Sequence, residues 1–207
     1  MSKNSRAVEK RGVFLASNSA LDFLNTEWPT PHGKEDFFET DEDVFIWLRQ
    51  AGLAAEGVEE VRPTGALLKA ARALRAVLRS LVQSRKAGKT PDFSELNAFL
   101  VAAQSHPQLV WTRSKSVALE TVRAADTAEE ILAPVALIAA ELFSTADFRR
   151  VRRCGEQTCV HWFLDTTRPG RRRWCSMATC GNRLKVKSYR QRLKKSRNHR
   201  SRKNRGN

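Results

Sequence analysis

The chain carries its four cysteines in two short stretches, CGEQTC at residues 154–159 and CSMATC at residues 175–180. Four residues separate the cysteines within each stretch, and fifteen residues separate the two pairs. Two thiolates from each of two turns, joined by a spacer long enough for a hairpin, can surround one tetrahedral ion. The spacing therefore predicts one structural zinc ion bound by Cys154, Cys159, Cys175 and Cys180. A redox-active disulfide pair is the alternative.

The spacer between the two pairs has the composition of a β-hairpin. Residues 160–165 and 171–175 are expected to be short strands, joined by the turn sequence TTRPG at residues 166–170. Ser176 can cap a helix that holds Cys180 in its first turn. A zinc knuckle, a hairpin and a helix that carries the last ligand predict a treble-clef-like finger. Because such a module buries little apolar area, zinc would supply on the order of 10–16 kcal/mol of binding free energy to its folding.

Positive charge is concentrated around and after these cysteines. Residues 149–207 contain 20 Lys and Arg but only two acids, Glu156 and Asp165, for a net charge of +18. Residues 1–148 contain 17 Lys and Arg against 20 acids, a net charge of −3, so the basic segment accounts for the whole-chain value of +15. This split favours a near-neutral globular domain followed by a polyanion-binding segment over a basic tail that only aids solubility.

A helix expected over residues 178–197 places basic residues along one stripe, because they recur at spacings of four, three, four and three. No acid lies among them, so a polyanion such as DNA would relieve their mutual repulsion. A narrower stripe of Val186, Tyr189 and Leu193 is expected to pack against the finger or the preceding domain. The candidate nucleic-acid-binding residues are Arg171, Arg172 and Arg173 in the spacer and Arg183, Lys187, Arg190, Lys194 and Arg197 on the helix.

The segment before the finger is expected to be mostly helical. Apolar residues spaced three and four apart predict the clearest helix over residues 64–86, and further helices are expected from residue 19 to 26, after Thr40, after Asp92, and from Asp126 to residue 143. The first of these is followed by a predicted loop that contains Pro29, Pro31 and Gly33. β-branched residues predict a hairpin within residues 109–122.

The fold class is thus predicted as α+β, a mainly helical N-terminal domain with a small β-hairpin followed by a treble-clef-like zinc finger. We expect disorder over residues 1–12, the helical domain over 13–147, the finger with its basic helix over 148–197, and a disordered basic tail over 198–207. No apolar run approaches the roughly 20 residues that span a bilayer, and no signal-peptide core is evident. We therefore expect a cytoplasmic protein with no membrane partner.

The finger and the first helix resemble a known family. The motifs WCSM at residues 174–177 and CGNR at residues 180–183 resemble the CGNR zinc-finger proteins, and ALDFLNT at residues 20–26 with Leu74-Arg75 is similar to the ABATE domain that precedes this finger in them. The family is described as "putative stress-induced transcription regulators", with DNA binding ascribed to the finger and an unidentified small ligand to the ABATE domain. The resemblance implies a regulator that binds DNA and senses a small-molecule effector.

Several polar residues keep two interpretations. Asn25 and Arg75, which stand in apolar helical patterns inside the family-like motifs, either form a core hydrogen bond between helices or contact the ligand, and they are the candidate ligand-binding residues. Asn182 either braces the zinc knuckle or reads a base edge. Arg183 either braces the knuckle or contacts phosphate.

Other functions are compatible with parts of this pattern. An RNA- or ribosome-associated zinc-binding protein is the main alternative, because rRNA phosphates would attract the same basic finger. An enzyme with its active site in the first domain is a third hypothesis. No catalytic cluster, phosphate-binding glycine loop or nucleophile elbow is recognisable there, so we predict that the protein is not an enzyme.

Overall fold

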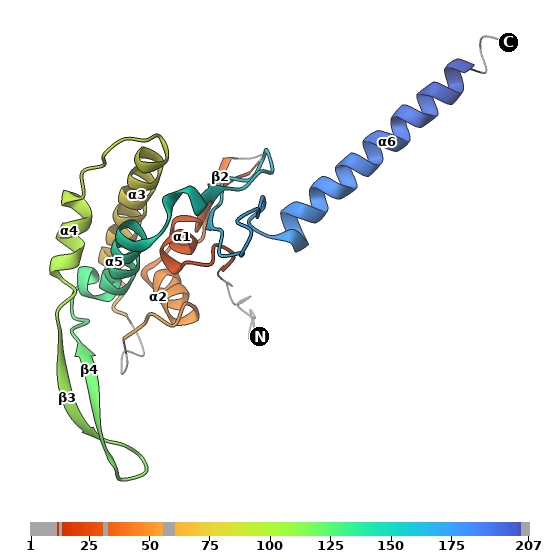
Figure 1. Cartoon of the computed structure of the whole chain (residues 1–207). Helices are drawn as coiled ribbons and strands as arrows, with labels where there is room; N and C mark the ends of the chain where they lie inside the picture. The colour runs from red at the N-terminus through yellow and green to blue at the C-terminus, as the bar shows by residue number, and fades with distance from the viewer. Residues whose placement is uncertain (1–11, 13, 31–32, 56–60, 204–207) are drawn as a thin grey trace, which may run out of the picture.

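The structure, a computed structural model, describes residue 12 and residues 14–30, 33–55 and 61–203 (Figure 1). Residues 1–11 and 204–207, which belong to the two segments expected to be disordered, lie outside this part of the chain. The N-terminal elements are, in order, α1 (Ser19–Leu24), β1 (Glu27–Thr30), β2 (Gly33–Asp36), α2 (Asp41–Gln50), α3 (Ala66–Lys86), α4 (Ser94–Val101), β3 (Ser105–Trp111), β4 (Val117–Arg123) and α5 (Ala128–Thr145).

The C-terminal elements build the finger. They are a 3-10 turn η1 (Phe148–Arg150), strands β5 (Val151–Arg153) and β6 (Trp162–Leu164), a π-helical turn η2 (Met177–Gly181) and the long helix α6 (Asn182–Lys203). Figure 1 shows a helical body from which the β3–β4 hairpin extends at one end and α6 projects from the other. The α+β fold class is confirmed, with strands that form separate antiparallel pairs within the described residues. None of the described helices combines the length and apolarity needed to cross a membrane.

Helix α3 forms the centre of the core. The apolar face predicted from its spacing is buried, as Leu67, Leu74 and Leu78 show. Across from it, the ring of Phe23 lies 5.2 Å from the ring of Trp47, edge to face. Helices α1, α3 and α5 pack together around these side chains.

The helix ends follow local capping chemistry. A capping box of Thr40 and Asp43 begins α2, the helix expected after Thr40. Helix α5, expected from Asp126, begins at Ala128 with Thr127 as its N-cap. Thr127 accepts a hydrogen bond from the backbone N–H of Glu130, and the Glu130 carboxylate accepts one from the N–H of Thr127. A hydroxyl and a Glu three residues apart satisfy two N–H groups reciprocally, which explains the register.

The loop expected after α1 is instead a hairpin, β1–β2. Its register places Glu27 opposite Asp36, and both carboxylates face arginines one turn apart on α3. Arg79 pairs with Glu27 at 2.6 Å, and Arg75 pairs with Asp36 at 2.5 Å. These ion pairs tie the hairpin to the core. A short two-stranded ribbon has few ladder hydrogen bonds to disrupt, so Pro29 does not prevent pairing.

The hairpin predicted within residues 109–122 is present as β3–β4, and it is longer, beginning at Ser105 and ending at Arg123. Leu109 pairs with Leu119, and Trp111 with Val117, on one face of the ribbon. All four side chains are exposed.

The predicted spacer hairpin of the finger is wrong in one strand. Strand β6 pairs with β5 (Val151–Arg153), upstream of the first cysteine, so that the Cys154–Cys159 loop forms the tip between them. Residues 171–175 are not a strand. They run beside the first cysteine loop, where the N–H of Gly155 donates to the carbonyl of Arg173 at 2.8 Å. This hydrogen bond stands in place of strand pairing and helps to bring the two cysteine pairs together.

The candidate metal centre and the basic helix

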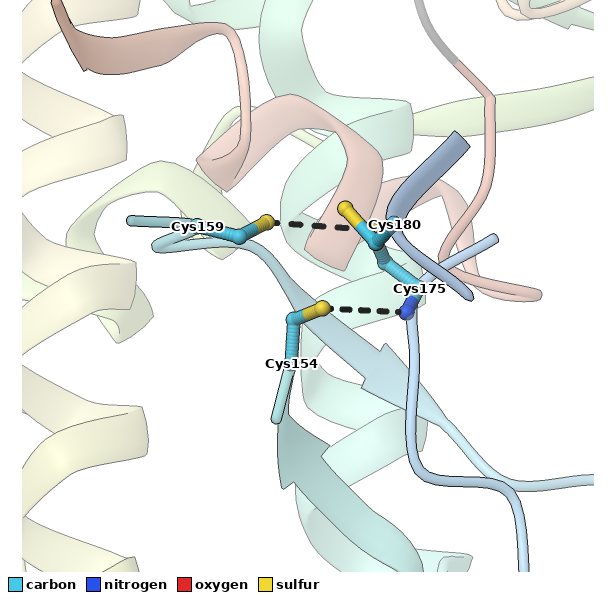
Figure 2. Close-up of side chains that lie close together, drawn as sticks. All are labelled: Cys154, Cys159, Cys175 and Cys180. Atoms are coloured by element: carbon cyan, nitrogen blue, oxygen red, sulfur yellow. Dashed lines mark hydrogen bonds between the residues drawn. The ribbon is translucent and has the colours of Figure 1, made fainter. Parts of the chain in front are cut away.

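The four cysteine side chains converge on one point (Figure 2). Their sulfurs all lie within 4.8 Å of one another, with 3.8 Å between Cys159 and Cys175 and 3.6 Å between Cys175 and Cys180. Four sulfurs at about 2.3 Å from a tetrahedral zinc ion are about 3.8 Å apart. A disulfide requires about 2.05 Å, and all four cysteines are free thiols. The geometry fits a metal ion rather than a disulfide.

Backbone hydrogen bonds orient the two cysteine loops. The N–H of Cys175 donates to the sulfur of Cys154 at 3.4 Å and links the two loops. The N–H of Cys154 donates to the carbonyl of His161 at 2.8 Å and closes the first loop. The predicted cap is present, because the Ser176 hydroxyl accepts from the N–H of Thr179 at the start of η2. The cap therefore fixes the direction in which the Cys180 side chain points from η2, the turn that precedes α6.

Without a cation, these crowded thiols cannot all ionise. The hydrogen bond from Cys175 lowers the pKa of Cys159 to about 5, and the same contact raises the pKa of Cys175. Burial raises the pKa of Cys180 to about 11. A dication at the centre stabilises thiolates. Zinc binding therefore displaces protons from this site.

Two family models match the chain. Residues 17–146, more than half of its length, match the ABATE model, which is described as "Putative stress-induced transcription regulator". The chain belongs to the ABATE family. Residues 150–193 match the CGNR zinc finger, so the finger binds one structural zinc ion through its four convergent cysteines. Neither is an enzyme family. No curated protein matches this sequence.

The two acids of the basic segment brace the CGNR finger from inside. Glu156 is buried, accepts hydrogen bonds from the N–H and hydroxyl of Thr158, and lies 3.9 Å from the guanidinium of Arg183. Asp165 is fully buried and accepts from the backbone N–H groups of Thr167 and Arg172. Sequence reasoning missed both residues. Both could have been identified as structural residues from the sequence, because they are the two acids among the 20 Lys and Arg of residues 149–207.

Arg172 also has an internal role. Its guanidinium lies 4.4 Å from the centre of the Phe163 ring and donates to the hydroxyl of Ser17 at 3.0 Å. It also donates to the carbonyls of Leu15 and Cys175. Arg172 therefore joins the ABATE domain to the zinc loop through most of its donors, whereas Arg171 and Arg173 beside it are exposed. Contact of any of the three with nucleic acid stays a prediction.

Helix α6 exposes the first part of the predicted basic stripe. Arg183, Lys187 and Arg190 are exposed and line one shallow hollow, together with Asn182. The Asn182 amide donates to the carbonyl of Ala178 at 3.2 Å, which supports a bracing role. The helix continues to Lys203, past the end expected at residue 197. The side chains of Lys194 and Arg197 are outside what the structure describes.

The apolar stripe of α6 does not pack as predicted. Val186, Tyr189 and Leu193 are 48%, 59% and 46% exposed. The reason is visible in Figure 1, where α6 points away from the body beyond its first turns. The prediction required α6 to lie against the finger or the preceding domain, whereas α6 leaves the turn at Cys180 in a direction away from both.

Asn25 and Arg75 have internal partners. The Asn25 amide donates to the carbonyl of Trp162 at 2.8 Å and accepts from its N–H at 2.9 Å, so it clasps strand β6 of the finger. Arg75 is 4% exposed and binds Asp36 through two hydrogen bonds and the Thr26 hydroxyl through a third. The bonds join a helix to a strand, not one helix to another. Contact of either residue with a ligand stays a prediction.

Proposed function

We propose that this protein is a zinc-dependent DNA-binding transcription regulator whose ABATE domain senses a small molecule. The observation that carries the proposal is the position of α6. This helix begins two residues after the last zinc ligand, projects from the body, and contains no acidic residue. The width of the B-DNA major groove, about 12 Å, admits a helix of this kind.

Zinc binding fixes the relative positions of the two basic segments that form this surface. Arg171 and Arg173 lie on the segment that ends at Cys175, and Arg183 begins α6 just after Cys180. The metal holds both segments at one point, so the three exposed guanidinium groups belong to one rigid surface. Phosphate contacts position a protein on DNA in this way, while base edges specify sequence. We assign Arg171, Arg173, Arg183, Lys187 and Arg190 to phosphate contacts, and we expect Lys194 and Arg197 to extend the same stripe.

The ABATE domain and the finger share contacts that support coupling between a sensor and a DNA-binding part. The N–H of Leu164 in β6 donates to the carbonyl of Ala16 at 2.8 Å, and Asn25 clasps Trp162. One continuous hydrophobic cluster includes Phe23 of α1 and Phe163 of the finger. A regulator of this design acts in the cytoplasm, where thiolates stay reduced and available to zinc. We assign it no catalytic activity.

The alternative is an RNA- or ribosome-associated zinc-binding protein. The observation that favours it is the density of Lys and Arg in the sequence beyond Lys187, where no acid occurs, because a structured RNA would attract such a segment as strongly as a duplex.

Competition at matched salt separates the two. Zinc-loaded full-length protein is bound to a labelled duplex of mixed sequence, then challenged with unlabelled duplex DNA or with a structured RNA of equal phosphate content. Displacement at lower concentration by DNA supports the regulator. Displacement at lower concentration by RNA refutes the DNA assignment and favours the alternative. Sequencing of DNA recovered with the protein from cells then supplies the target site.

A further inference from the structure

A cavity lies at the junction between the ABATE domain and the zinc finger. It has a volume of about 250 Å³. Trp28, Arg79 and Gln83 line it from β1 and α3, and Arg153, Val160 and Trp162 line it from the finger. Drug-sized ligands occupy pockets of roughly 300–1,000 Å³, so this cavity suits a molecule of one or two rings.

Its charges are unbalanced. Arg79 is neutralised by Glu27 at 2.6 Å and also donates to the carbonyl of Leu24. Arg153 is exposed at the rim, and no carboxylate pairs with its guanidinium in the part of the chain that the structure describes. The cavity therefore offers one uncompensated cation with fork geometry, which binds a carboxylate through two parallel hydrogen bonds.

Its walls are aromatic and held in place. Trp28 and Trp162 are both half-buried, one from each part of the protein. The backbone of Trp162 is clasped on both sides by the Asn25 amide, and the strand of Trp28 is anchored by the ion pair between Glu27 and Arg79. Two positioned indoles favour a flat ring, because aromatic contacts add to the gain from apolar burial.

We propose that this junction cavity binds a small aromatic carboxylate, whose ring contacts Trp28 and Trp162 and whose carboxylate pairs with Arg153. The proposal rests on the sensing role proposed above and names its ligand class and its place. Because the walls come from both parts of the chain, a bound ligand contacts strand β6 directly. The strand leads to the zinc loop from which α6 departs. Any effect of the ligand on DNA affinity is matched by an equal effect of DNA on ligand affinity.

Ligand binding can be followed at the tryptophan side chains, of which the chain contains five. In ¹H–¹⁵N spectra of the zinc-loaded full-length protein, each indole N–H gives one resonance, assigned by single Trp→Phe variants. Benzoate and indole-3-acetate are titrated as probes, with benzamide and indole-3-acetamide as uncharged controls. We expect saturable shifts of Trp28 and Trp162 with the carboxylates, at least tenfold weaker affinity for the amides, and no shift of Trp111, which lies on the distant β3–β4 hairpin.

Arg153→Gln tests the cation. This variant should weaken carboxylate binding about tenfold or more and leave amide binding unchanged. Arg123→Gln removes an exposed arginine from β4 and should bind like wild type. The proposal is overturned if neither probe saturates at Trp28 and Trp162, or if both arginine variants weaken binding equally, which would indicate nonspecific attraction to a basic protein.

Failure here is distinguishable from failure of the proposed function. DNA affinity is measured separately, without any probe. Saturable carboxylate binding together with absent DNA binding would refute the regulator and leave the cavity assignment standing. Intact DNA binding with silent Trp28 and Trp162 resonances would refute the cavity assignment alone.

Discussion

Replacing Lys187 and Arg190 together by alanine tests whether α6 is the DNA-binding surface. Both side chains are exposed and line the same hollow along α6, and neither is a zinc ligand or part of the buried core. The variant removes two positive charges and leaves the helix, because alanine has the highest helix propensity. Its effect on binding should therefore be electrostatic.

The magnitude follows from the number of phosphate contacts. Arg171, Arg173, Arg183, Lys187 and Arg190 are exposed, and Lys194 continues the stripe. With about six contacts, the slope of log affinity against log salt is near −5 for duplex DNA, so raising salt from about 50 to 200 mM weakens binding roughly a thousandfold. Losing two contacts flattens the slope by about two units, and the same salt change then costs only roughly a hundredfold.

The assay is fluorescence anisotropy with a labelled duplex at four or five salt concentrations. A matched control replaces Arg113 and Arg123 by alanine, which removes the same charge from the β3–β4 hairpin. The control should keep the wild-type slope. Zinc content is measured on every sample. An unchanged slope in the Lys187/Arg190 variant, with zinc intact, would show that α6 is not the contact surface and would remove the mechanism of the proposed regulator.

Three further outcomes are expected. Elemental analysis should find one zinc ion per protomer, lost in Cys180→Ser with a lower melting temperature of the whole protein, because finger and ABATE domain share one hydrophobic cluster. Asn25→Ala leaves two polar groups of Trp162 unpaired and should destabilise the fold by about 2–4 kcal/mol in urea titrations; a loss under 0.5 kcal/mol would contradict the clasp. Burial raises the pKa of Asp22 to about 6, so keeping this carboxylate ionised in the folded protein above that pH costs stability. Asp22→Asn should therefore stabilise the protein by up to about 3 kcal/mol at pH 8 but hardly at pH 4. Equal effects at the two pH values would refute this reasoning, and Glu120→Gln serves as the control.

The zinc site could be predicted from sequence because its determinants are local. Cys154 and Cys159 share one loop, Cys175 and Cys180 another, and a metal needs only that the two loops meet. The same is true of helix α3 and of the cap at Thr40, whose signals lie within a few residues. Local patterns report which residues are buried and where a helix begins.

Polar partners were not predictable in this way. Asn25 and Trp162 are 137 positions apart, and Arg172 reaches Leu15 across a comparable span. A polar residue in an apolar pattern indicates that some partner exists, yet hydrogen-bond chemistry does not distinguish one backbone amide from another. Arg172 illustrates the consequence. It is one of three consecutive arginines, and the Phe163 ring together with the carbonyls of Leu15 and Cys175 draws it inside while its neighbours face solvent.

The sequence by itself determined the metal, its four ligands, the helical core and the charge division between the two parts of the chain. Tertiary structure alone decided that β6 pairs with β5, that Arg75 serves the β1–β2 hairpin, and that α6 projects with Val186 and Tyr189 exposed. It also created the junction cavity, whose walls come from both parts. Spacing along the chain encodes periodicity and ligand geometry, whereas these features depend on which surfaces meet after the chain has folded, and that choice is settled by the packing of the whole core.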